Sequence, residues 1–126
     1  MDEIEARLTL PKGAFGLNEY GRAYAKSRDH VVRGTLVVPP TFPSAADGCG
    51  VALENFATRP CTAAEIAQST SSERKMVERF VPAGHRRWYD DERAVPYMSD
   101  GSCRVVTLEY DTAAKRFLYV ACNGQA

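Results

Sequence analysis

The residues of this sequence that could carry out chemistry are few and far apart. There are two histidines, His30 and His85, and neither has another histidine two or four positions away, the spacing of a metal-binding pair on one element. His85 could act as an acid–base partner of a cysteine thiol, but nothing around the cysteines indicates an activated thiolate. We expect both histidines to be polar residues at the start of strands, and we expect no metal site.

Carboxylates, glycines and serines give no stronger indication of catalysis. Asp90, Asp91 and Glu92 with Asp100 could supply a two-carboxylate site, yet adjacent residues of a strand point to opposite faces and would not converge. The glycine pairs at 13–16 and 48–50 lack the spacing of phosphate-binding loops. Helix capping accounts for the run of hydroxyls at 69–72. We therefore expect a protein that is not an enzyme and needs no cofactor.

The four cysteines, Cys49, Cys61, Cys103 and Cys122, include no pair separated by two residues, which argues against a zinc knuckle and a thioredoxin-like motif. Cys49 and Cys61 flank a short segment and could form one disulfide. Alternatively, two to four of the cysteines are reduced and buried as small apolar side chains. Four cysteines in a chain of 126 residues favour an oxidising compartment.

Cys103 and Cys122 lie at the ends of two strand-like runs, 104–110 and 116–122, which predict a hairpin. With Asp111 opposite Ala114, every cross-strand pair is chemically sensible and the two cysteines face each other within disulfide range. A loop of three or five residues would separate them unless a bulge restores the register.

The run from His85 to Arg93 is the densest polar and aromatic segment, rich in residue types found at binding hot spots. As a strand it places Arg87 and Tyr89 on one face, and Trp88 on the other. We predict that Trp88 belongs to the core, because large aromatic side chains dominate core burial. Arg87 and Tyr89 would then form an exposed binding surface.

The elements that must position these residues indicate an α+β fold. We expect an extended lead-in over 1–12, a helix over 19–26 capped by Asn18 with Tyr20 and Tyr24 on one face, and a strand over 31–38. Capping boxes at 62–65 and 70–73 predict two short helices, the second burying Met76, Val77 and Phe80. The interpretation is one domain, residues 1–126, in which an antiparallel sheet of about four strands packs against an N-terminal helix and short central helices, in a cystatin-like or similar arrangement.

Charge and hydropathy narrow the choice of partners. Lys plus Arg and Asp plus Glu number 16 each, so the basic excess typical of nucleic-acid binding is missing. No run approaches the ~20 apolar residues of a membrane span. The acidic N-terminus contains no signal peptide, which leaves both a cytoplasmic location and a removed export signal open. A net charge of zero gives little protection against self-association, so a homodimer is one expected partner state.

Two parts of the chain resemble small, uncharacterised bacterial envelope proteins. They are the segment Tyr20-Gly-Arg-Ala-Tyr24 and the tail with Asp100-Gly-Ser-Cys103, Tyr110-Asp111 and Ala121-Cys122-Asn123-Gly124. The resemblance implies export and a C-terminal hairpin and carries no known activity. The segment from Cys49 to Pro82 has no counterpart in it.

Three functional hypotheses follow. The first is an exported or periplasmic protein-binding or inhibitor-like module, with Arg87 and Tyr89 or the Pro/Gly-rich loop at 39–50 as its contact surface. The second is a cavity for a small ligand or a reaction, lined by His85 and the aromatic residues Tyr20, Tyr24, Trp88 and Tyr97. The third is a cytosolic structural protein with reduced thiols.

Overall fold

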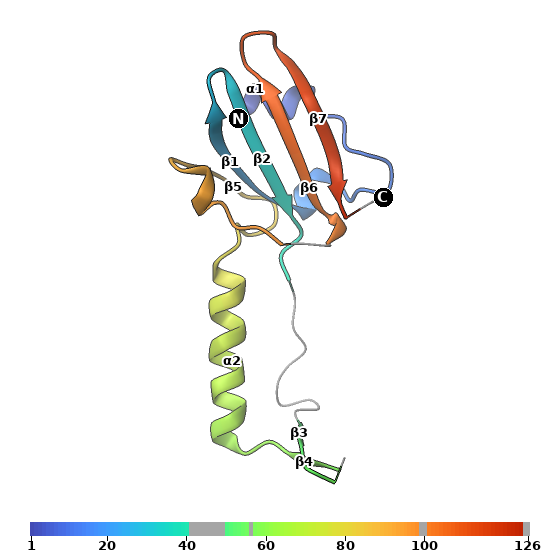
Figure 1. The fold of residues 1–126 in the computed structure, drawn as a ribbon, viewed down its shortest axis with the longest axis vertical. Helices are drawn as coiled ribbons and strands as arrows, with labels where there is room; N and C mark the ends of the chain where they lie inside the picture. Colours follow the sequence, from blue (N-terminus) through green and yellow to red (C-terminus); the bar gives the residue numbers. More distant parts are fainter. Residues whose placement is uncertain (41–49, 56, 99–100, 125–126) are drawn as a thin grey trace. The chain divides into compact units, whose positions relative to one another are not determined.

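The computed structural model describes residues 1–40, 50–55, 57–98 and 101–124. They belong to two compact units (Figure 1). The sheet unit comprises Met1–Pro39 with Phe80–Ala126, and the helix unit comprises Pro40–Arg79. Both sheets and helices are present, so the predicted α+β class is confirmed. That residues 1–126 form a single domain stays a prediction.

The sheet unit is built on a mixed sheet of five strands in the order β5-β1-β2-β6-β7. Its elements, in chain order, are α1 (Asp2–Arg7), the 3-10 helix η1 (Leu17–Glu19), β1 (Gly21–Arg28), β2 (Val31–Val37), β5 (Arg86–Tyr89), the 3-10 helix η2 (Glu92–Ala94), β6 (Ser102–Asp111) and β7 (Arg116–Asn123). β5 runs parallel to β1, while the other neighbours are antiparallel. The prediction of a purely antiparallel sheet of about four strands is therefore wrong. Parallel pairing needs a long connection, and residues 38–85 supply one.

The predicted helix over 19–26 is also wrong, because this segment forms η1 and then β1. Tyr20 and Tyr24 are four residues apart, a spacing that puts two side chains on one face of a helix and equally on one face of a strand. The residues next to Tyr24 decide the matter: Ala23 and Ala25 are buried on the opposite face of β1. A strand buried on both faces uses all these residues, whereas a surface helix would expose half of them.

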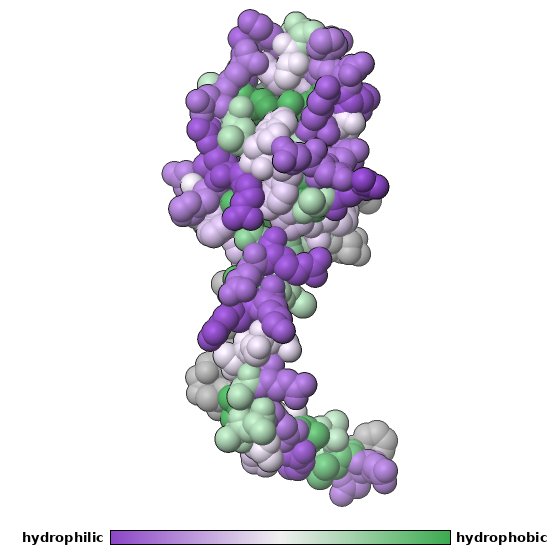
Figure 2. Space-filling view, turned by 90° about the vertical axis from the view of Figure 1, so that its left-hand side faces the viewer, coloured by the Kyte–Doolittle hydropathy of each residue, from purple (hydrophilic) through white to green (hydrophobic). Residues whose placement is uncertain are grey.

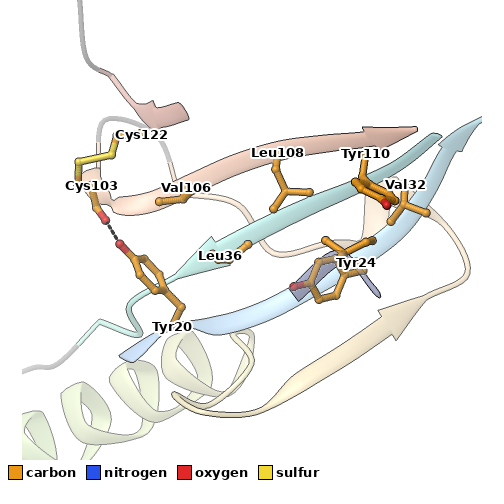
Figure 3. Close-up of a cluster of buried hydrophobic side chains, with 10 residues drawn as sticks. Tyr20, Tyr24, Val32, Leu36, Cys103, Val106, Leu108, Tyr110 and Cys122 are labelled. Carbon is orange, nitrogen blue, oxygen red and sulfur yellow. Dashed lines mark hydrogen bonds between the residues drawn. A yellow bond between two sulfur atoms is a disulfide. The ribbon is translucent and has the colours of Figure 1, made fainter. Parts of the chain in front are cut away.

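The main core lies on one face of this sheet, which we call the first face (Figure 3). Most of its side chains come from even-numbered positions in or next to the strands, one comes from α1, and Cys103 comes from the irregular start of β6. The buried members are Ile4, Tyr20, Tyr24, Val32, Leu36, Cys103, Val106, Leu108, Tyr110 and Cys122. Residues 2–7 are thus a helix that buries Ile4, where an extended lead-in was expected. Gly34 sits at the centre, where an added Cβ would come 2.9 Å from both Leu108 and Tyr24.

The terminal hairpin forms as predicted, but its register differs. Asp111 pairs with Arg116, and the Asp111 carboxylate accepts hydrogen bonds from the N–H groups of Ala113 and Ala114, both 2.9 Å long, so that residues 112–115 form the loop. Leu118 is an unpaired bulge residue of β7. A second irregularity leaves three residues of β6 without partners on β7, between the pairs Ser102–Asn123 and Val106–Cys122.

The second irregularity brings Cys103 close to Cys122, and a disulfide joins the two residues, whose Cα atoms are 4.6 Å apart. The predicted Cys103–Cys122 bridge is thus present although the predicted pairing is not. The other predicted bridge involves Cys49, which lies outside the described residues. No described cysteine is a free thiol.

The helix unit contains the antiparallel pair β3 (Gly50–Ala52) and β4 (Thr58–Pro60), followed by α2 (Ala63–Glu78). The capping box at Thr62 is confirmed: its hydroxyl accepts from the N–H of Glu65 at 3.2 Å, and the Glu65 carboxylate accepts from the N–H of Thr62 at 3.0 Å. The second predicted helix start at Thr70 is wrong, because α2 continues through it. Met76 and Val77 are exposed and Phe80 is half-buried, so the predicted buried face is wrong as well. Neither α2 nor another described helix is long and apolar enough to cross a membrane.

Candidate functional site

Strand β5, which carries the predicted binding residues, is held in place by a cluster of charges around Glu5. The Tyr24 hydroxyl donates to Oε2 of Glu5 at 2.7 Å, and Nε of Arg22 lies 3.4 Å from the same oxygen. Arg86 of β5 donates to Oε1 of Glu5 at 3.2 Å and also pairs with Asp2. Burial, with the hydrogen bond to Glu5, raises the pKa of Tyr24, and Asp2 raises the pKa of Arg86. Helix α1 is thereby joined to both β1 and β5.

Arg87 and Tyr89 lie together on the face of the sheet opposite the main core, which we call the second face. They stand beside Ala23 and Ala25 of β1, and the Arg87 guanidinium lies 5.9 Å from the centre of the Tyr89 ring, within reach of a cation–π contact. Arg87 is exposed and Tyr89 is half-buried. This arrangement leaves a cation and an aromatic ring side by side at the edge of the sheet.

Trp88 lies on the first face, beside Tyr24, and is 43% exposed. The prediction that it belongs to the core is wrong, because β5 is an edge strand and the buried cluster does not reach across it. Trp88 instead helps to line a small cavity of about 240 Å³ with Lys26 and His30. His85, just before β5, is exposed, and its carbonyl accepts a hydrogen bond from the N–H of Arg22 at 3.0 Å.

Among the described strands β5 stands at the end of the sheet, so its outer edge presents backbone groups that no other described strand pairs with. In a parallel pair alternate residues of each strand bond to the neighbour. Because the carbonyl of His85 bonds to β1, the same side of β5 must include Arg87 and Tyr89. The N–H and C=O groups of Arg86 and Trp88 therefore point away from β1. Seen from this side, the sheet unit is covered mostly by hydrophilic side chains, with hydrophobic ones in small patches (Figure 2).

The second face also carries a groove, formed between the sheet and residues 91–98, which we call the strap. The strap leads from the end of β5 to β7, where Asn123 donates to the hydroxyl of Tyr97 at 2.9 Å and to the carbonyl of Met98 at 3.2 Å. The groove has a volume of about 410 Å³. Its lining comes from β1, β2 and the strap and consists of Ala25, Arg33, Thr35, Glu92, Arg93, Val95 and Tyr97.

The charges of the strap are partly used within it. The Asp91 carboxylate accepts hydrogen bonds from Nε of Arg93 at 3.1 Å and from a terminal nitrogen of Arg93 at 2.8 Å. This pairing lowers the pKa of Asp91 and raises the pKa of Arg93. Of the predicted carboxylates, Asp91 is thus engaged by Arg93. Asp100 lies outside the described residues.

The predicted aromatic lining does not gather around one cavity. Tyr20 and Tyr24 have no exposed surface and belong to the first-face core, where the Tyr20 hydroxyl donates to the Cys103 carbonyl and accepts from the N–H of Phe15 at 3.1 Å. Tyr97 lies on the strap, and His85 and Trp88 belong to the β5 segment. Within the described ranges, no group of three or more His, Cys, Asp or Glu side chains lies close enough together to hold a metal ion.

Sequence reasoning missed Arg33 and Thr35 as members of a possible site, and it considered Glu92 only as part of a two-carboxylate site. One signal was available for Arg33, which is the one charged residue in the otherwise apolar or small run Val31–Val38. Thr35 gave no such signal, and the position of Glu92 in the same groove depends on the path of the strap.

No protein family, curated protein or solved structure matches this chain.

Proposed function

We propose that this protein is a non-enzymatic, exported or periplasmic module that binds a protein partner, in the manner of an inhibitor, through the β5 side of its sheet unit. The observation that carries the proposal is the edge strand itself. The Arg87 guanidinium lies within cation–π reach of the Tyr89 ring on the second face, Trp88 is exposed on the first face, and the backbone groups between them point outward from the sheet edge. Arginine, tyrosine and tryptophan are the residues most enriched at interface hot spots.

The location in this proposal is supported by the Cys103–Cys122 disulfide, which is consistent with an oxidising compartment. Cytoplasmic placement with reduced thiols is the alternative. That the sheet is cystatin-like also stays a prediction.

The outward edge of β5 suits an extended segment of a partner, which would add a strand to the sheet. Arg86 and Trp88 offer at most two N–H and two C=O groups, each worth about 0.5–1.5 kcal/mol net. Association itself costs about 4–15 kcal/mol. Backbone pairing alone therefore gives no stable complex, and the side chains of Arg87, Trp88 and Tyr89 must supply the rest.

The test is affinity capture from a bacterial envelope or secreted fraction with the immobilised chain. The variants Arg87→Ala and Tyr89→Ala are compared with Arg104→Ala, an exposed arginine on β6, as the matched control. Far-UV circular dichroism checks that each variant folds. We expect a protein that is captured by the wild type and by the control and is lost with either β5 variant. A partner retained by both β5 variants refutes this surface, and the absence of any captured protein refutes the proposed function.

Sedimentation of the purified chain tests whether the partner is a second copy of the same chain. A dimer that dissociates in Arg87→Ala or Tyr89→Ala, and persists in Arg104→Ala, would mean that the binding surface serves self-association.

A further inference from the structure

The groove between the second face and the strap has the size and lining of a small-molecule site. Its volume of about 410 Å³ falls in the range of about 300–1,000 Å³ that ligand pockets occupy. Small side chains make its floor, since Ala25 and Thr35 are both buried in the sheet. A few polar groups among small or apolar ones are typical of sites that fix the orientation of a ligand.

Arg33 brings an uncompensated positive charge to this groove. Its side chain is exposed and makes no hydrogen bond or ion pair with any of the residues that the structure describes. The carboxylate across from it on β6 belongs to Glu109, but Glu109 pairs with Arg28 at 3.1 Å instead. A guanidinium on a sheet face, with its cross-strand carboxylate already engaged, is suited to a carboxylate from outside, which it can bind with two parallel hydrogen bonds.

Glu92 brings the opposite charge from the strap. Its Oε2 atom is buried and has no hydrogen-bond donor among the described residues, and the carboxylate forms no direct ion pair there. Its neighbour Arg93 is bonded to Asp91, and Glu92 acts on Arg93 only as a minor electrostatic influence. A carboxylate that is partly removed from water without a donor is suited to a donor supplied by a ligand.

We propose that this groove binds a small zwitterion of the amino-acid type, with the ligand carboxylate on Arg33 and the ligand ammonium on Glu92. Among the residues that the structure describes, one cation and one anion of the groove, Arg33 and Glu92, have no partner, so an anion or a cation alone would leave one of them unsatisfied. The buried Thr35, which carries a hydroxyl, and the apolar Val95 also line the groove and would contact the body of the ligand. The site uses neither Arg87 nor Trp88 and goes beyond the proposed binding of a protein partner.

The test is calorimetric and NMR titration of the full chain with each of the common L-amino acids at millimolar concentration. We expect at least one to bind and to shift the amide signals of Ala25 and Thr35. Arg33→Gln and Glu92→Gln should each weaken binding about 10- to 100-fold, the effect of losing a hydrogen bond to a charged group. Arg104→Gln, which removes the same charge from β6, should bind as the wild type does.

Modified ligands separate the two contacts. The N-acetyl form of the bound amino acid lacks the ammonium, so the wild type and Glu92→Gln should bind it equally weakly. The amide form lacks the carboxylate, so the wild type and Arg33→Gln should bind it equally weakly. Binding that survives both substitutions, or signal shifts that avoid Ala25 and Thr35, would overturn the site. The absence of binding by every amino acid to the wild type would overturn it too. Capture of a protein through β5 should be unchanged in both variants, so the two proposals can fail separately.

Discussion

Replacing Cys103 and Cys122 together by alanine should lower the free energy of unfolding of the sheet unit by about 3 kcal/mol. The bridge joins residues 19 apart, and the chain-entropy relation gives about 3 kcal/mol at 25 °C for closing a loop of that length in the unfolded chain. Both cysteines are 7% exposed and belong to the core, so the lost sulfur contacts act in the same direction. Residual hairpin structure in the unfolded state would act in the opposite direction.

The measurement is urea unfolding of wild type and the double variant, followed by near-UV circular dichroism. The fully buried tyrosines Tyr20, Tyr24 and Tyr110 belong to the sheet unit, as does Trp88, and all of them contribute to that signal, whereas far-UV dichroism would mix in α2. Substitution is preferable to a reductant, because no described cysteine is a free thiol and a reductant would act outside this hairpin as well.

Equal unfolding free energies for the two proteins would refute the reasoning, as would alkylation of Cys103 or Cys122 in the unfolded wild type before reduction. Peptide mapping without reductant gives the independent check, since it should recover the two strands of the hairpin as one linked fragment. If the wild type proved to have no Cys103–Cys122 bridge, the support for an oxidising compartment would be lost as well.

Three further perturbations test other parts of the structure. Tyr20→Phe removes the hydroxyl that joins the N-terminal loop to β6 and leaves buried backbone groups unsatisfied, so urea unfolding should show a loss of about 1–3 kcal/mol. Gly21→Ala would place a Cβ 1.7 Å from the carbonyl oxygen of Val81, and since backbone cannot yield as a side chain does, we expect a loss of about 3 kcal/mol or more; a thermal midpoint equal to the wild type would contradict this contact. Arg59 lowers the pKa of Glu65 from 4.5 to about 2, so the contribution of the ionised Glu65 to the stability of α2 is present above about pH 4.5 and is lost as the pH falls toward 2. Helical dichroism should decline over that window, and Glu65→Gln should remove this part of the decline.

The terminal hairpin could be predicted because its signals are local. Two alternating runs with an aspartate-led turn between them require only neighbouring residues to pair. The register could not be predicted, because it depends on which of several loops forms. Asp111 closes the loop at 112–115 by accepting two backbone N–H groups, and Leu118 then leaves the ladder. The disulfide prediction was right, but for a different reason: the irregularity in β6, and not the predicted cross-strand pairing, brings Cys103 and Cys122 together.

The N-terminal part could not be predicted because its pattern fits two structures. Tyr20 and Tyr24 satisfy the helical and the strand period alike, and the deciding fact is that Ala23 and Ala25 are covered on the other side. That cover is provided by parts of the chain distant in sequence. The parallel placement of β5 is of the same kind: its pattern indicates a strand, but the choice of β1 as neighbour depends on tertiary contacts such as Arg86 with Glu5.

The two faces of the sheet divide stability from binding, and this division explains why the candidate site was difficult to find in the sequence. The first face holds the tyrosines, the large aliphatic side chains and the disulfide, which together form the core. On the second face the groove floor is made of the small residues Ala25 and Thr35, so the strap packed against it leaves a groove instead of a filled interface. Arg33 and Glu92, which have no role in the core, both line this groove, and the strap that carries Glu92 is tied to Asn123. Breaking that tie with Asn123→Ala should therefore reduce ligand binding in the groove while leaving the buried tyrosine signal of the first face intact.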